Sequence, residues 1–322
     1  MMRWLAFVLI LPLLACEPRV IVTRTPSTQT ATASASIAPS PSTTASPTPA
    51  KVALRPVTGI VPATRLLSYE RASDIPRIFL QFVLTDDGRV ITVDARGDFM
   101  QRRLTPSGTA AMVLQAIETG LFERDASHSR VLLPGPPPLG RGATIFIVLV
   151  ANGPRQIRVT FEPTGQPDDS MYEPSATREK LTALVRGYED LSWVPASRWA
   201  ESRQQPYQPA AHRLFLQIEP NANPLRSPAD AESVWPFLTA IESVGELVTG
   251  VTAPWRCAVL VDDDARTLVE SLTRAGAITR YGPGSPSAQT DLTWRGSGTL
   301  RLQISPLLPH EPLTCAGAPT PL

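Results

Sequence analysis

Histidine is the side chain on which nucleophilic and zinc-dependent catalysis most often depend, and this chain of 322 residues has three. His128, His212 and His310 each stand alone, without the second histidine that a zinc-binding HExxH helix supplies. A serine nucleophile typically occupies a GxSxG turn, which the sequence lacks. The histidines therefore predict no catalytic residue and no metal ligand, and His128, between two serines, is interpreted as a solvated loop residue.

Carboxylates form three short clusters, at 86–87, 168–169 and 262–264. Such clusters can bind calcium or divide into an acid and a base for hydrolysis. Each also has a structural interpretation, respectively a hairpin turn, a Pro/Gly-rich loop and a helix N-cap. The alternating Asp/Asn pattern of a calcium-binding loop is absent. The glycine pairs at 282/284 and 296/298 match neither the dinucleotide-binding nor the phosphate-binding loop pattern, so no cofactor is predicted.

Arginine neighbours tryptophan at three places, which offers stacking and cation–π contacts to a glycan or a peptide. The alternative is that the rings anchor the core while the arginines reach solvent. The pairs are Arg198–Trp199, Trp255–Arg256 and Trp294–Arg295. A rigid proline-rich loop at 134–138 is a further candidate for docking a partner, or a simple surface excursion.

From about Leu66 onward, hydrophobic periodicity divides the chain into strands and helices. The first part predicts strands at 78–84, 89–94, 99–104, 144–150 and 156–161. A helix after 105–107 has Leu114, Ile117 and Leu121 on one face, and a second helix covers about 175–190. The later part predicts strands at 214–218, 257–261, 290–294 and 299–304. Its helices begin after 227–228 and after 262–264, and Pro236 should kink or split the first of them.

Hairpin signals mixed with crossover helices predict an α+β fold with mixed, mostly antiparallel sheets. The length allows one large domain or two small ones, and we favour two small halves. The predicted first half is 56–195, the connector 196–211 and the second half 212–318.

The N-terminus combines a short positive region with an apolar run at 4–14 that is too short to span a bilayer. Residues 1–15 are predicted to be a signal peptide, and the segment Leu13-Leu14-Ala15-Cys16 at its end and just beyond resembles the lipobox of bacterial lipoproteins. That resemblance implies a lipidated Cys16 anchored on the exported side of the cell membrane. The alternative is an ordinary signal peptide with Cys16 incidental.

Ser, Thr, Pro and Ala dominate the chain from 25 to 50. With little apolar surface to bury, residues 16–55 are predicted to form a disordered tether after the lipidated cysteine. An O-glycosylated stalk is equally consistent with this composition.

Two cysteines remain once Cys16 is assigned to the lipid. An even pair in an exported protein predicts a disulfide between Cys257 and Cys315. The alternative is two separate thiols, with Cys257 buried as a small apolar residue.

A net charge of +1 offers no electrostatic basis for nucleic-acid binding. The 86–91 turn, the 118–122 helix end and the segment 306–311 with Cys315 together resemble uncharacterised bacterial lipoproteins, a family that implies no activity. We therefore expect a lipid-anchored, non-enzymatic binding or structural module at the cell envelope, whose partner is an envelope protein, peptide or glycan. A solute or signal receptor is the first alternative, and a carboxylate-dependent hydrolase is the second.

Overall fold

The protein is described by a computed structural model. The residues it describes are 50–72, 78–129, 143–160, 176–220, 229–248, 254–278, 281–282 and 284–316. The predicted signal peptide, Cys16, the proline-rich loop at 134–138 and the carboxylates at 168–169 lie outside these ranges.

Two sheets and four α-helices make up the described chain, which confirms the predicted α+β class. The first sheet has the strand order β5-β7-β6-β1-β2-β3-β4-β8, and all its pairs are antiparallel except β5 with β7. Its strands are β1 (Arg65–Ala72), β2 (Ile78–Thr85), β3 (Arg89–Val93), β4 (Phe99–Arg103), β5 (Ala126–Ser129), β6 (Ala143–Val150), β7 (Gly153–Thr160) and β8 (Gln205–Pro206).

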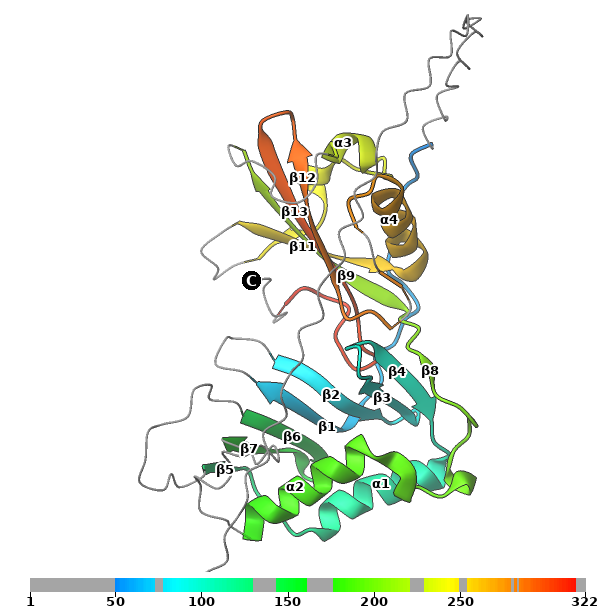
Figure 1. Ribbon diagram of the computed structural model, residues 1–322, viewed down its shortest axis with the longest axis vertical. Coiled ribbons are helices and arrows are strands. Elements are labelled where there is room, and N and C mark those ends of the chain that lie inside the picture. Colours follow the sequence, from blue (N-terminus) through cyan, green and yellow to red (C-terminus); the bar gives the residue numbers. More distant parts are fainter. Residues whose placement is uncertain are drawn as a thin grey trace, which may run out of the picture. The chain divides into compact units, whose positions relative to one another are not determined.

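Helices α1 (Pro106–Glu118) and α2 (Ala176–Glu189) lie together against one side of this sheet (Figure 1). Phe82 of β2 stacks on Tyr188 of α2, with ring centroids 4.8 Å apart, in the middle of this core. The opposite side of β2 and β3 carries Val83 and Ile91, which Tyr207 covers. Burial on both sides explains why β2 is an almost continuous apolar run.

The apolar face predicted for α1 is not the face that the helix buries. Met112 and Ala116 pack into the core, whereas 51% of Leu114 and 41% of Ile117 remain exposed. The helix has apolar residues on more than one face, so periodicity could not select the buried one. Thr105 caps it as the sequence indicates, accepting a hydrogen bond from the Gly108 N–H.

The second sheet has the order β10-β11-β9-β13-β12 and is entirely antiparallel. Its strands are β9 (Ala211–Glu219), β10 (Glu246–Leu247), β11 (Trp255–Val261), β12 (Ala288–Trp294) and β13 (Gly298–Pro306). Leu214 and Leu216 of β9 face the core shared with the helices, while Phe215 faces Trp255 and Cys257 on the other side. This alternation along the central strand decides which side chains can meet α4.

Two helices belong to this sheet, α3 (Ala231–Val234) and α4 (Asp262–Arg274). The helix expected across Pro236 is interrupted, which is the split that the proline predicted: α3 stops at Val234, and Leu238 is exposed. Single turns of 3-10 helix occur at Leu191–Trp193, Ala196–Arg198 and Ile241–Ser243.

Residues 51–55, inside the predicted tether, are hydrogen-bonded to α3, to the chain that follows α3 and to α4. The Val52 N–H donates to the Pro236 carbonyl at 2.8 Å. The Arg55 guanidinium contacts Asp263 and Asp264, and its backbone N–H donates to Asp264 at 2.8 Å. Since Asp264 is buried, these contacts compensate a charge that would otherwise be costly.

The segment after β13 contacts elements of both sheets. The Tyr207 hydroxyl donates to the Leu307 carbonyl at 2.6 Å, and the Ala63 N–H donates to the Pro309 carbonyl at 2.7 Å. The chain then reaches Cys315, which forms a disulfide with Cys257 of β11. The predicted cysteine pairing is thus present. Among the described residues, no helix is both long and apolar enough to cross a membrane.

Candidate functional site

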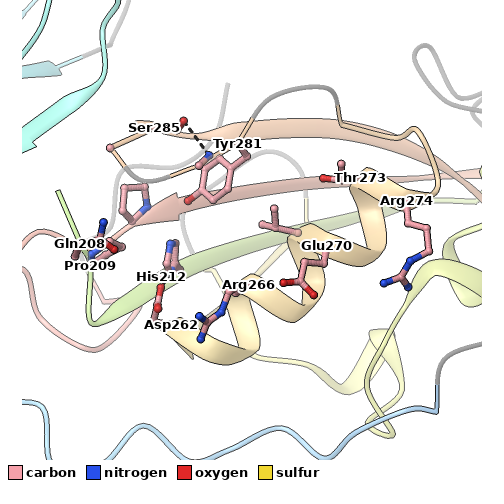
Figure 2. A pocket seen from close by; sticks show the side chains of 14 residues that line it. Gln208, Pro209, His212, Asp262, Arg266, Glu270, Thr273, Arg274, Tyr281 and Ser285 are labelled. Atoms are coloured by element: carbon pink, nitrogen blue, oxygen red, sulfur yellow. Dashed lines mark hydrogen bonds and ion pairs between the residues drawn. The ribbon is translucent and has the colours of Figure 1, made fainter. Parts of the chain in front are cut away.

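A cavity of about 620 Å³ lies beside α4, where β9 begins and β13 ends. Figure 2 shows its lining side chains, which come from α4, from the start of β9 and from the segment at 281–285. The lining residues are Gln208, Pro209, His212, Asp262, Arg266, Val269, Glu270, Thr273, Arg274, Tyr281, Gly282, Gly284, Ser285 and Pro306. A volume of this size suits a small molecule.

Helix α4 forms one wall of this pocket because it is amphipathic. Ala265, Leu268 and Leu272 are fully buried in the core of the second sheet. The pocket residues 266, 269, 270, 273 and 274 therefore occupy a different stripe at helical spacing. Val269 is the partly buried member, and Glu270 and Thr273 are exposed at the opening.

His212 and Tyr281 meet at the inner wall, with ring centroids 6.0 Å apart (Figure 2). His212 follows the alternation of β9, so it points to the same side as Leu214, towards α4. Neither His212 Nδ1 nor the Tyr281 hydroxyl has a hydrogen-bond partner among the described residues, although both atoms are buried. An unpartnered buried polar atom costs about 1–3 kcal/mol of stability.

Both groups at the inner wall are uncharged at neutral pH. Burial lowers the pKa of His212 to about 4. Burial also raises the pKa of Tyr281, and the negative charge of Asp262 raises it further. The Asp262 carboxylate lies 3.8 Å from His212 Nδ1, but a neutral imidazole makes no ion pair. The inner wall therefore offers neutral hydrogen-bonding groups, and the 3.8 Å gap is too long for a base-orienting hydrogen bond.

The carboxylate clusters are not brought into one site among the described residues. Asp86 and Asp87 form the β2–β3 turn and line a different cavity from Asp262. Burial favours a higher pKa for Asp87, but hydrogen bonds from Thr85 and Arg89 outweigh it, and the pKa is lowered. An ionised turn residue of this kind suits a structural role rather than a general acid.

The cluster at 262–264 lies in the first turn of α4, and the predicted cap is wrong. Val261 occupies the N-cap position and makes no side-chain cap bond. The negative charges of the three aspartates still interact favourably with the positive, N-terminal end of the helix dipole. No group of three or more His, Cys, Asp and Glu suited to a metal ion occurs within the described ranges.

The other two histidines lie away from the pocket. His128 is in β5, so the loop expected there is in fact a strand. His310 lies in the segment after β13, where burial and, to a smaller extent, the charge of Arg65 lower its pKa to about 4. Its Nδ1 is buried and has no hydrogen-bond partner among the described residues.

The tryptophans of the three Arg–Trp pairs are all buried, which favours their interpretation as core anchors. The Arg295 guanidinium lies 4.8 Å from the ring centroid of Trp294. Trp199 is covered by Arg102, which lies far from it in sequence, with 4.0 Å between guanidinium and ring centroid. The Arg256 guanidinium donates to the backbone carbonyls of Val244 and Gly245, which gives it a structural role within the protein.

A second, apolar cavity of about 830 Å³ lies along the exposed face of α1. Leu114 and Ile117 line it together with the β2–β3 turn. These two residues belong to the face that the sequence predicted to be buried, whereas Leu121, the third residue of that face, packs against the core.

Sequence reasoning missed most of the pocket. Tyr281, Glu270 and Arg274 were not singled out, because they follow no catalytic motif. The available signal was the second stripe of α4, which combines the exposed charged residues Arg266, Glu270 and Arg274 with the partly buried Val269. The position of Tyr281 opposite His212 depends on the path of the chain after α4, which has no local signature.

In comparisons with known proteins, no family model, no curated protein and no solved structure matches this chain.

Proposed function

We propose that this chain is an exported, lipid-anchored binding protein without catalytic activity, and that the α4 pocket holds its small-molecule ligand. The observation that carries the proposal is the pocket of about 620 Å³, lined by apolar side chains together with His212, Tyr281 and four charged residues. A concave volume of this size with a few polar groups is typical of ligand sites. The receptor for a solute or signal is therefore favoured over a purely structural module.

The anchor and the location rest on the N-terminal sequence. The lipobox-like 13–16 segment and the Ser/Thr/Pro/Ala-rich 25–50 segment support attachment to the exported face of the membrane through Cys16. The net charge of +1 supports a partner other than nucleic acid. In this arrangement the tether holds the binding domain away from the lipid surface.

The test is a thermal-shift screen of the full chain, extracted in mild detergent, with amino acids, peptides, sugars and cell-wall fragments. A ligand at 100 times its Kd stabilises the protein by about 2.7 kcal/mol, which raises Tm by several degrees. Thr273→Trp should abolish this shift, because Thr273 is exposed at the pocket opening and a larger ring there occupies the cavity.

Ala183→Trp on the exposed side of α2 is the matched control, since it adds the same ring far from the pocket lining. A ligand shift that survives Thr273→Trp contradicts the assignment of the pocket. Cys16→Ser checks the anchor in the same preparations, because it should move the protein out of the membrane fraction.

A protein-docking role is the second candidate function. The apolar cavity beside Leu114 and Ile117 favours it, because exposed apolar surface of this kind marks interaction sites. Crosslinking in cells through a photoreactive residue at position 114 would identify such a partner.

A further inference from the structure

The charges around the α4 pocket carry information about its ligand, and we infer that the ligand is a zwitterion with an uncharged body, such as an amino acid or a short peptide. This inference rests on the proposed binding function of the same pocket. It follows from which lining charges are already compensated within the protein and which are not.

Two of the four charged side chains that line the pocket have their charges compensated. Arg266 pairs with Asp263, one turn earlier on α4. Asp262 lies in the first turn of α4, where the helix dipole favours a negative charge. Neither therefore requires a charged ligand.

The other two, Glu270 and Arg274, have no ion-pair partner among the described residues, and both are exposed at the opening. They are spaced four residues apart on one helix face, so their Cβ atoms lie about 5–6 Å apart. They nonetheless make no salt bridge with each other among the described contacts (Figure 2). A carboxylate and a guanidinium one turn apart can bind an ammonium and a carboxylate that are a few bonds apart in a ligand.

The rest of the lining excludes further charge on the ligand. His212 is neutral because burial lowers its pKa to about 4, and Tyr281 keeps its proton. Val269, Pro209 and Pro306 add apolar surface to the lining. With His212 neutral, the lining charges of Asp262, Glu270, Arg266 and Arg274 cancel, which matches a ligand of zero net charge.

The two charges of the ligand therefore stay at the opening, beside Glu270 and Arg274. Its uncharged body contacts the apolar side chains and the His212 and Tyr281 rings that line the rest of the pocket.

The experiment is isothermal titration calorimetry of the full chain with leucyl-glutamine and two derivatives that each remove one charge. The N-acetylated derivative lacks the ammonium, and the C-terminal amide lacks the carboxylate. Free glutamine and free leucine are titrated alongside to distinguish an amino-acid site from a peptide site. The zwitterion should bind about twofold to fivefold more tightly than either derivative, because each lost ion pair lies at the exposed opening, where ion pairs contribute little.

Charge-removing variants then assign each contact. Glu270→Gln should remove the preference for the free ammonium and keep the preference for the carboxylate, and Arg274→Gln should do the reverse. Glu179→Gln and Arg186→Gln on α2 are matched controls, because both residues are exposed and lie outside the pocket lining. These controls should leave all affinities unchanged.

The two levels of the proposal fail differently. Equal affinity for the zwitterion and its derivatives, or binding only of a compound without both charges, overturns the zwitterion inference while the binding function stands. If every compound is without effect in the screen and in calorimetry, both the ligand class and the binding function are rejected.

Discussion

At the scale of single residues, the alternation of β9 decides the chemistry of the pocket. His212 and Leu214 point to the side of α4, whereas Arg213 points to the opposite side and pairs with Glu311 at 3.2 Å. A shift of register by one residue would exchange these neighbours and place a charged guanidinium in the pocket. The neutral imidazole at the inner wall is thus a consequence of strand pairing as well as of residue type.

Protonation of His212 should make stability depend on pH. The pKa of His212 is lowered from 6.5 to about 4 in the folded protein, so the unfolded chain binds a proton more readily. Its contribution to stability is complete above pH 6.5 and is lost as pH falls towards 4, by at most about 3 kcal/mol. Urea unfolding of the wild type and of His212→Gln between these limits measures this loss.

The free energy of unfolding should depend less on pH in His212→Gln than in the wild type. His310 contributes in the same direction, because its pKa is also lowered to about 4. Glu70 opposes both, because burial raises its pKa and favours the folded form at low pH. Parallel curves for the wild type and His212→Gln would show that His212 is not buried in its neutral form.

At the scale of elements, the segment from 281 to 285 is positioned by backbone contacts with the first sheet. The Phe99 N–H donates to the Gly284 carbonyl at 2.5 Å, and the Gly284 N–H donates to the Tyr207 carbonyl at 3.2 Å. Gly284 has a φ of +85°, and a Cβ there would lie 2.5 Å from the Phe99 carbonyl oxygen. The same glycine therefore determines how closely the pocket wall approaches β4.

Gly284→Ala should destabilise the protein by about 2 kcal/mol or more, because it adds a backbone clash to the cost of a left-handed alanine. Gly97→Ala is a matched control, with φ of +86° but open space around the added Cβ. Gly97→Ala should lower the free energy of unfolding only by the cost of placing an alanine in the left-handed region, about 1 kcal/mol. Chemical denaturation of both variants measures the difference, and equal losses would contradict the close approach at Gly284.

At the scale of the whole described domain, the segment from Leu307 to Cys315 is held at both ends. Leu308 packs beside Val83 and Ile91 of the first sheet, and the disulfide joins Cys315 to Cys257 of the second. This tail therefore ties contacts of the first sheet covalently to the second sheet. A disulfide acts mainly by restricting the unfolded chain, and the restriction increases with the length of the closed loop.

Removing the disulfide should cost about 4 kcal/mol for a sequence separation of 58 residues. The measurement is urea unfolding of the wild type and of the double variant Cys257→Ser, Cys315→Ser, each with and without reductant. Reductant should lower the free energy of unfolding of the wild type to that of the double variant. The free energy of unfolding of the double variant should not change. A wild type that is insensitive to complete reduction would contradict a stabilising bond.

Local patterns in the sequence determined the elements that have strong signals. The apolar run of β2, the hairpin at 86–88, the cap at Thr105 and the strands that contain 290–294 and 299–304 were all predictable, because their signals lie within a few neighbouring residues. The short strands β8 and β10 were not, because two residues carry no periodicity and pair only where a neighbouring strand has an open edge.

The sequence by itself also determined the fold class, through its hairpin and helix signals, and the pairing of Cys257 with Cys315, because these two cysteines remain once Cys16 is assigned to the lipid. Only the tertiary structure decided which face of α1 is buried, that Asp264 binds Arg55, and that Tyr281 meets His212 beside α4. These contacts join residues that are distant in the chain, and their energies depend on burial and orientation, which no local pattern encodes. The pocket is the product of those contacts, which is why its residues share no motif.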